Sequence, residues 1–261
     1  MLSRACVVSS RSVWGLTRMP TLILRLAAPL QAWGAAEEGE FRRVNPYPTR
    51  SGIMGMIANA AGHLRGDAPG PWEGLRIGVR VDRAGTLIRD YHTAHRASAS
   101  APSLSRRMYL SDAVFLVGLE GDAEVLDAVI GVLSAPKRPL FLGRKGCPPS
   151  VPVLGDILTA TLEDALNEHP WLPSEIALTG DQKARAKRVT DKGDLVLDTF
   201  VEPTSYVAGA ATVRDVPVSR VSNDRRFLSR QVVAGKVVLP CTSTVVPRSV
   251  DKPIPHDPFD F

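Results

Sequence analysis

The sequence has little cysteine and no long apolar run, and each absence excludes a class of protein. Its three cysteines, Cys6, Cys147 and Cys241, are far apart and form no CxxC pair, so neither a disulfide framework nor a zinc site is expected. No stretch approaches the roughly 18 consecutive apolar residues of a membrane-spanning helix. Sparse, unpaired cysteines are typical of a reducing compartment, and we predict a cytoplasmic location.

Motifs of the common catalytic and cofactor sites are also missing. The chain contains no HExxH, GxSxG, GxxxxGK[ST] or GxGxxG sequence. None of its histidines has convincing ligand spacing to another His, Asp or Glu; they are His63, His92, His95, His169 and His256. We therefore predict no metal ion and no cofactor.

The positive charge is modest in total and uneven along the chain. The net charge is +5 with a pI near 9.3, but three arginines lie in residues 1–18, and without them the charge falls to +2. This segment has no acid and no continuous apolar core, so a secretory signal is not expected, and a transit peptide fits its composition only. We interpret it as a disordered or mis-annotated extension before a start at Met19.

Three stretches combine basic residues with very little acid. They are residues 39–62, 91–111 and 136–150, and tyrosines or histidines are interspersed in the first two. Ordinary surfaces mix both signs, so such stretches favour a nucleic-acid interface, where Arg and Lys contact phosphates and rings stack on bases. A solvated basic surface is the alternative, and the pattern alone leaves both open.

Apolar periodicity predicts an α+β fold. Strands are expected at 21–30, 75–83, 86–94 and 108–121, and helices at about 50–62 and 122–136. This β–α–β–β–β–α order approximates a ferredoxin-like plan with one elongated hairpin. We expect a domain over 19–150 with a thumb hairpin at about 86–118, and a less regular, β-rich C-terminal region over 151–261 packed on it.

Five sequence blocks, in order over about 130 residues, resemble the CasD family, the small RAMP-superfamily subunit of the type I-E CRISPR surveillance complex Cascade. The blocks are LILRLAAPLQAWG (22–34), YPTRSGIMGMIANAAG (47–62), RDYHTA (89–94), RRMYLSDAVFLVGL (106–119) and PLFLGRKGCPP (139–149). The resemblance implies an RRM-like fold that grips the 5′ handle of CRISPR RNA (crRNA) without cutting it. It also implies contact with the neighbouring backbone subunit and the large PAM-recognising subunit, and so indirectly with target DNA.

The resemblance and the basic stretches together give a set of expected RNA-binding residues. They are Gln31, Trp33, Arg42, Arg43, Thr49, Arg50, Ser51, Gly52, Tyr91, His92, Thr93, Arg106, Arg107, Tyr109, Arg144 and Lys145. Trp33 either stacks on a base or is a buried structural residue. Gly52 and Gly55 each cost a helix about 1 kcal/mol relative to alanine. Either the helix N-terminus binds a phosphate closely, with Arg50 adding a bidentate contact, or the glycines permit tight packing.

A metal-independent endoribonuclease is the main alternative, because sister RAMP subunits of another subtype process the RNA themselves. Such cleavage needs a base, an acid and a cation near the scissile phosphate. His92, Lys145 and Tyr47 or Tyr91 have the required chemistry. A generic RNA chaperone or a small-molecule enzyme is a more distant possibility.

Overall fold

The computed structural model describes residues 19–34, 41–64, 66–94, 103–172, 194–219 and 226–240. The expected N-terminal extension, residues 1–18, lies outside these ranges. The elements are β1 (Thr21–Ala27), β2 (Leu30–Gln31), β3 (Phe41–Arg42), α1 (Arg50–Ala60), the 3₁₀ turn η1 (Pro71–Gly74), β4 (Arg76–Arg83), β5 (Thr86–Ala94), β6 (Ser103–Ser111), β7 (Val114–Glu120), α2 (Ala123–Ser134), β8 (Leu154–Leu158), α3 (Leu162–Glu168), β9 (Leu195–Val201), β10 (Ala211–Ser219) and β11 (Arg226–Leu239). None of the described helices is long and apolar enough to cross a bilayer.

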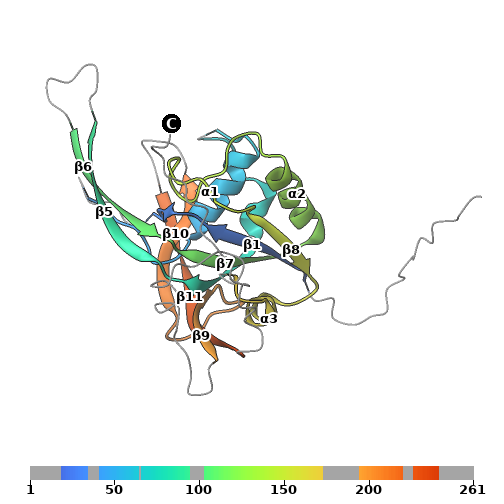
Figure 1. The fold of residues 1–261 in the computed structure, drawn as a ribbon. Helices are drawn as coiled ribbons and strands as arrows, with labels where there is room; N and C mark the ends of the chain where they lie inside the picture. The colour runs from blue at the N-terminus through green and yellow to red at the C-terminus, as the bar shows by residue number, and fades with distance from the viewer. Residues whose placement is uncertain are drawn as a thin grey trace, which may run out of the picture.

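The centre of the fold is a seven-stranded antiparallel sheet in the order β10-β11-β9-β4-β7-β1-β8 (Figure 1). Within it, α1 connects β1 to β4 and α2 connects β7 to β8, so each connected pair encloses a strand of the other. This is the strand order of two interleaved βαβ units. The predicted α+β class is confirmed. The C-terminal strands extend the sheet, since β9 pairs directly with β4.

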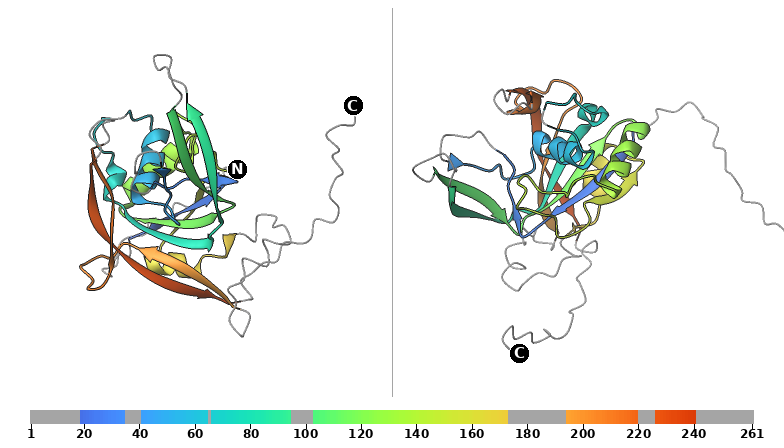
Figure 2. Two further views of the ribbon diagram at one scale, coloured as in Figure 1. Left: turned by 90° about the vertical axis from the view of Figure 1, so that its left-hand side faces the viewer. Right: turned by 90° about the horizontal axis from the view of Figure 1, so that it is seen from above.

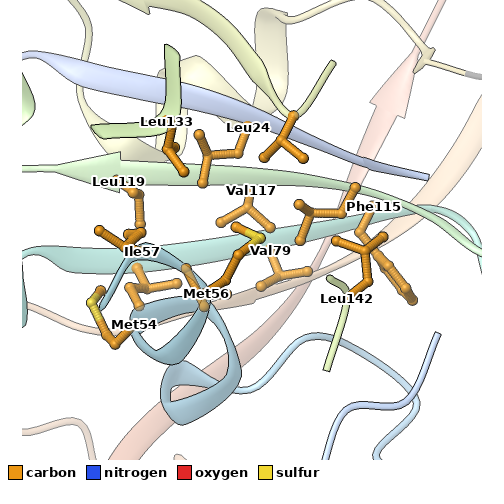
Figure 3. Packing of buried hydrophobic residues seen from close by; sticks show 14 of the residues in the cluster. Leu24, Met54, Met56, Ile57, Val79, Phe115, Val117, Leu119, Leu133 and Leu142 are labelled. Atoms are coloured by element: carbon orange, nitrogen blue, oxygen red, sulfur yellow. The ribbon is translucent and has the colours of Figure 1, made fainter. Parts of the chain in front are cut away.

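Helices cover both faces of the sheet. Apolar side chains of β1 point alternately to these two faces, so the strand contributes to a core on each. Leu22, Leu24 and Leu26 belong to the main core with α1 and α2, while Ile23 and Ala27 belong to a second core under α3. In Figure 3, Met56 and Ile57 of α1 lie against Val79 and Val117 of the sheet. Both cores consist of fully apolar side chains, which supply the main driving force for folding.

Two glycines allow α3 to lie close to the second face. Gly78 of β4 and Gly118 of β7 are register partners. A Cβ atom at Gly78 would lie 2.7 Å from the Leu166 Cδ1 atom, and one at Gly118 would lie 2.5 Å from the Leu162 Cδ1 atom. A Cβ atom at either position would therefore displace the leucine side chains through which α3 packs on the sheet.

A buried ion pair holds the C-terminal end of α3. The Arg80 guanidinium and the Asp82 carboxylate, both on β4, are fully buried and form two hydrogen bonds of 2.6 and 2.9 Å. Arg80 also donates to the carbonyls of Leu166, His169 and Pro170 at the end of the helix. A cation at this position complements the negative end of the helix dipole.

The β5–β6 hairpin leaves the main sheet and projects from the body (Figures 1 and 2). The predicted single strand over 108–121 is wrong, because the chain bends at Asp112, where φ is +55°, and divides into β6 and β7. Gly85, with φ of +73°, faces this bend, and a Cβ atom there would lie 2.5 Å from the Ser111 carbonyl oxygen. The two residues thus form the junction from which the hairpin extends.

Candidate nucleic-acid interface

The three basic stretches found in the sequence meet beside the middle of strand β6 of the hairpin. Strand β3 runs parallel to β6, with Phe41 opposite Arg106 and Arg42 opposite Arg107. From the third stretch, the Arg144 guanidinium donates to the Met108 carbonyl at 3.0 Å and the Arg42 carbonyl at 3.3 Å. We call the cationic residues gathered here the basic cluster: Arg42, Arg43, Arg106, Arg107, Arg144 and Lys145.

The cations of the basic cluster differ in how much they expose. Arg106 is exposed, with its guanidinium carbon 5.1 Å from the centre of the Phe41 ring, and Lys145 is exposed on the adjoining loop. Arg107 is half-buried and donates to the Ser105 hydroxyl at 3.2 Å. Arg144 is half-buried and lies 4.7 Å from the centre of the Tyr109 ring. Arg144 therefore ties the loop to the hairpin, while Arg106 and Lys145 present charge to solvent.

A close backbone approach fixes the loop that carries Arg144 and Lys145. The Ala32 N–H donates to the Leu142 carbonyl at 3.1 Å. Gly143 has φ of +88°, and a Cβ atom there would lie 1.9 Å from the Ala32 carbonyl oxygen. Only glycine fits this position. Cys147 packs in the core beneath the loop, and burial raises the pKa of its thiol.

The N-terminus of α1 is occupied by the protein itself, which corrects one expectation. The Thr49 hydroxyl accepts the Gly52 N–H at 3.2 Å, and the Arg50 N–H donates to the Asp215 carboxylate at 2.8 Å. The Arg50 guanidinium is buried, pairs with Glu202 at 2.8 Å, and donates to the Leu75 and Glu73 carbonyls. Arg50 and Thr49 thus join the N-terminal part of the chain to its C-terminal strands and offer no group to a phosphate.

The glycine at 52 has a packing explanation. A Cβ atom on Gly52 would lie 2.8 Å from the Trp33 Cε3 atom, so a side chain there would displace the tryptophan. At Gly55 a Cβ would meet nothing within 4 Å, and internal packing does not require that glycine. Ser51 is partly exposed, with its hydroxyl 3.3 Å from that of Thr49.

Gln31 and Trp33 are structural residues, which corrects their expected role in base contact. Both are fully buried. The Gln31 amide donates to the Ala113 carbonyl at 2.7 Å and accepts the Trp33 indole N–H at 3.0 Å. Because Ala113 lies in the β6–β7 bend, these bonds fix the junction of the hairpin. The buried alternative for Trp33 is the one observed.

The outer arm of the hairpin is exposed. Tyr91 and Thr93 of β5 are exposed, and the Tyr91 side chain lies in register with Arg106. The His92 Nδ1 atom lies 2.7 Å from the Asp90 carboxylate, and Asp90 is opposite Arg107. The expected residues of this arm therefore lie on the same hairpin as the basic cluster.

Comparison with known proteins assigns the family. A family model described as CRISPR-associated protein (Cas_Cas5) matches residues 21–233. The chain belongs to this Cas5 family. It is similar to the CRISPR system Cascade subunit CasD of Escherichia coli (strain K12), with 32% identity over 185 residues that cover 61% of this chain and 83% of that protein.

Two solved structures resemble the Cas5-family fold described here. A chain of a CRISPR RNA-guided surveillance complex superimposes with a TM-score of 0.69 and 29% identity, covering 88% of this chain and 95% of that one. A crystal structure described as that of a Cas protein superimposes with a TM-score of 0.62 and 35% identity, covering 87% of this chain and 97% of that one. The family resemblance identified from the sequence blocks is confirmed.

Of the residues considered for RNA cleavage, Tyr91 and His92 are neighbours on β5, whereas Tyr47 and Lys145 come from other parts of this Cas5-family chain. Tyr47 stacks on Phe200 of β9, with 3.9 Å between ring centres. Burial raises the pKa of Tyr47, and the nearby Asp215 carboxylate adds to this effect while Arg230 opposes it. A smaller fraction of Tyr47 is therefore deprotonated at neutral pH, which makes it a poorer base. His92 lies on the projecting hairpin, and Lys145 on the loop after α2. Among the described residues, no group of three His, Cys, Asp or Glu could hold a metal ion.

Sequence reasoning missed one exposed residue of the interface. Phe41 directly precedes Arg42 and Arg43, is 44% exposed, and lies under the Arg106 guanidinium. An exposed ring beside paired cations is a recurring feature of single-strand binding surfaces. That adjacency, visible in the sequence, was the available signal.

Proposed function

We propose that this chain is the non-catalytic RNA-binding subunit of a type I-E Cascade complex and grips the 5′ handle of crRNA. In this proposal the interleaved βαβ units form the ferredoxin-like, RRM-like domain of the RAMP superfamily, and the β5–β6 hairpin is its thumb. The chain links the neighbouring backbone subunit to the large PAM-recognising subunit and so acts indirectly on target DNA. The similarity to CasD and to a chain of an RNA-guided surveillance complex supports this assignment.

The observation that supports the RNA-binding role is the convergence of three basic stretches beside the middle of strand β6. Backbone pairing brings Arg42 beside Arg107, and Arg144 joins them from a loop more than thirty residues further along the chain. Arginines suit phosphate oxygens, with which they form charge-assisted, bidentate hydrogen bonds. Arg43, Arg106 and Lys145 are the members best placed for such contacts, because their side chains are exposed.

Arg106→Ala should weaken retention of handle RNA by about 1–3 kcal/mol, because one charged hydrogen-bonding partner of the phosphates is lost. The measurement is the amount and sequence of RNA that co-purifies with the complex expressed from its operon. The control is Lys236→Ala, which removes an exposed cation from β11 and should leave RNA retention unchanged. Equal RNA retention by the Arg106 variant and the wild type would contradict the proposal.

One observation favours the endoribonuclease as a second candidate. The Asp90 carboxylate, 2.7 Å from His92, is placed to orient that ring as a base. We expect repeat RNA incubated with the purified protein in EDTA to remain intact, as judged by gel electrophoresis. A handle-length product that disappears in His92→Ala would overturn the non-catalytic proposal and identify His92 as a catalytic residue.

A further inference from the structure

We propose that Phe41 and Tyr91 form a base-stacking site for single-stranded RNA, with Arg106 between them. The three residues come from three neighbouring strands: Phe41 from β3, Arg106 from β6 and Tyr91 from β5. Phe41 and Tyr91 are both register partners of Arg106. Directly opposed residues point to the same face of a sheet, so the three side chains form one row. The contact of 5.1 Å between Arg106 and the Phe41 ring agrees with this placement.

Both rings of the row are accessible. Tyr91 is 59% exposed and Phe41 is 44% exposed, which is unusual for aromatic residues of regular strands. Strand pairing holds the row in place, because β2 and β3 pair with one edge of β6 and β5 pairs with the other. The rings thus stand on a supported surface with a face open to a ligand.

The charge on this face selects the ligand. By register, the other side chains on the same face of the hairpin are Leu87, Arg89, Thr93, Leu104, Met108 and the buried Leu110. No carboxylate is among the described residues of this face, whereas Asp90 points to the opposite face. The face therefore combines Arg89 and Arg106 with two exposed rings and several apolar side chains. The arginines suit phosphates and the rings suit bases, and single-stranded nucleic acid presents both.

The spacing of the row does not match two successive bases of a stacked helix. Neighbouring strands are about 4.8 Å apart, so rings two strands apart are separated by roughly 10 Å. Successive bases in a helical strand are only about 3.4 Å apart. Two successive bases held by the row must therefore be unstacked from each other, as occurs where proteins bind unpaired RNA.

Arg106 has a defined place in this arrangement. Its guanidinium lies over the Phe41 ring. When it turns to a phosphate, it uncovers that ring for a base. One residue then couples a backbone contact to stacking, and loss of Arg106 and loss of Phe41 should not be additive.

This inference rests on the proposed function, so the experiment tests both RNA binding by the wild type and the contribution of the two rings to it. The probe is the RNA recovered from the complex, resynthesised with a fluorophore, and the measurement is its Kd for the full-length protein by anisotropy. Phe41→Leu and Tyr91→Leu remove a ring but keep apolar volume, whereas Phe41→Tyr and Tyr91→Phe keep the ring. Tyr206→Leu removes a ring that is 83% exposed elsewhere and serves as the matched control.

We expect Phe41→Leu and Tyr91→Leu each to bind about tenfold more weakly, and Phe41→Tyr, Tyr91→Phe and Tyr206→Leu to bind like the wild type. Abasic substitutions in the RNA should reduce the difference in Kd between Phe41→Leu and the wild type. Wild-type affinity in both Phe41→Leu and Tyr91→Leu would overturn the stacking site and leave the proposed function standing. Unchanged RNA affinity with weaker association of another subunit would assign the row to a protein interface instead. Failure of the wild type to bind the probe would overturn both proposals.

Discussion

Asp82→Ala is expected to lower the free energy of unfolding by about 3–5 kcal/mol, because it leaves the Arg80 guanidinium buried without its counter-ion. Neither side chain of the pair is exposed to solvent, so water cannot replace the lost carboxylate. The Asp82 carboxylate also accepts the Leu172 N–H at 2.8 Å, and this bond is lost as well. The measurement is equilibrium urea unfolding followed by circular dichroism.

The matched control for this variant is Asp127→Ala, which removes an exposed aspartate from α2. Its effect should stay within about 0.5 kcal/mol, as for most surface substitutions. Since Arg80 holds the last carbonyls of α3, Asp82→Ala should also expose the segment after the helix to proteolysis. Equal urea midpoints for the two variants would show that the pair does not stabilise the fold as described.

Gly143→Ala is expected to destabilise the protein by about 3 kcal/mol or more. The left-handed backbone conformation alone costs a non-glycine residue roughly 1–2 kcal/mol. In addition, the new Cβ would lie 1.9 Å from the Ala32 carbonyl oxygen, so two backbone segments must separate. Their separation would weaken the hydrogen bond from the Ala32 N–H to the Leu142 carbonyl. Thermal unfolding at a series of urea concentrations measures the loss in the free energy of unfolding.

Gly146→Ala is the control within the same loop, because a Cβ there would meet nothing within 4 Å. It should unfold at nearly the wild-type temperature. Because the loop carries Arg144 and Lys145, Gly143→Ala should also weaken RNA binding at temperatures where the protein remains folded. A Gly143 variant as stable as the Gly146 variant would contradict the role given to this close approach.

Local patterns in the sequence were sufficient to predict the elements that build the sheet. A continuous apolar run identified β1, which is buried on both faces, and alternating or helical apolar spacing identified β4, α1 and α2. The division at Asp112 was missed because the apolar run continues through it, and the bend depends on a φ of +55° that aspartate adopts without a sequence signal. The short strands β2 and β3 depend on pairing with β6, which is distant in the sequence.

The binding residues show a different limit. Arg50 lies in a basic stretch and resembled its neighbours, but its partner Glu202 is 152 positions away, so their pairing was invisible in the sequence. Charge clustering identified the stretches that meet at the hairpin, and only strand register decided which side chains face solvent. Phe41 was missed because its importance depends on lying opposite Arg106.

The salt dependence of handle binding tests the central proposal most directly. Each phosphate contact to a single strand contributes about 0.7 to the slope of log K against log salt concentration. Removal of two exposed cations of the basic cluster, in an Arg106→Ala, Lys145→Ala protein, should therefore make the slope shallower by about 1.4, while Lys236→Ala leaves it unchanged. An identical slope for the double variant and the wild type would contradict the proposal that the basic cluster holds the RNA backbone.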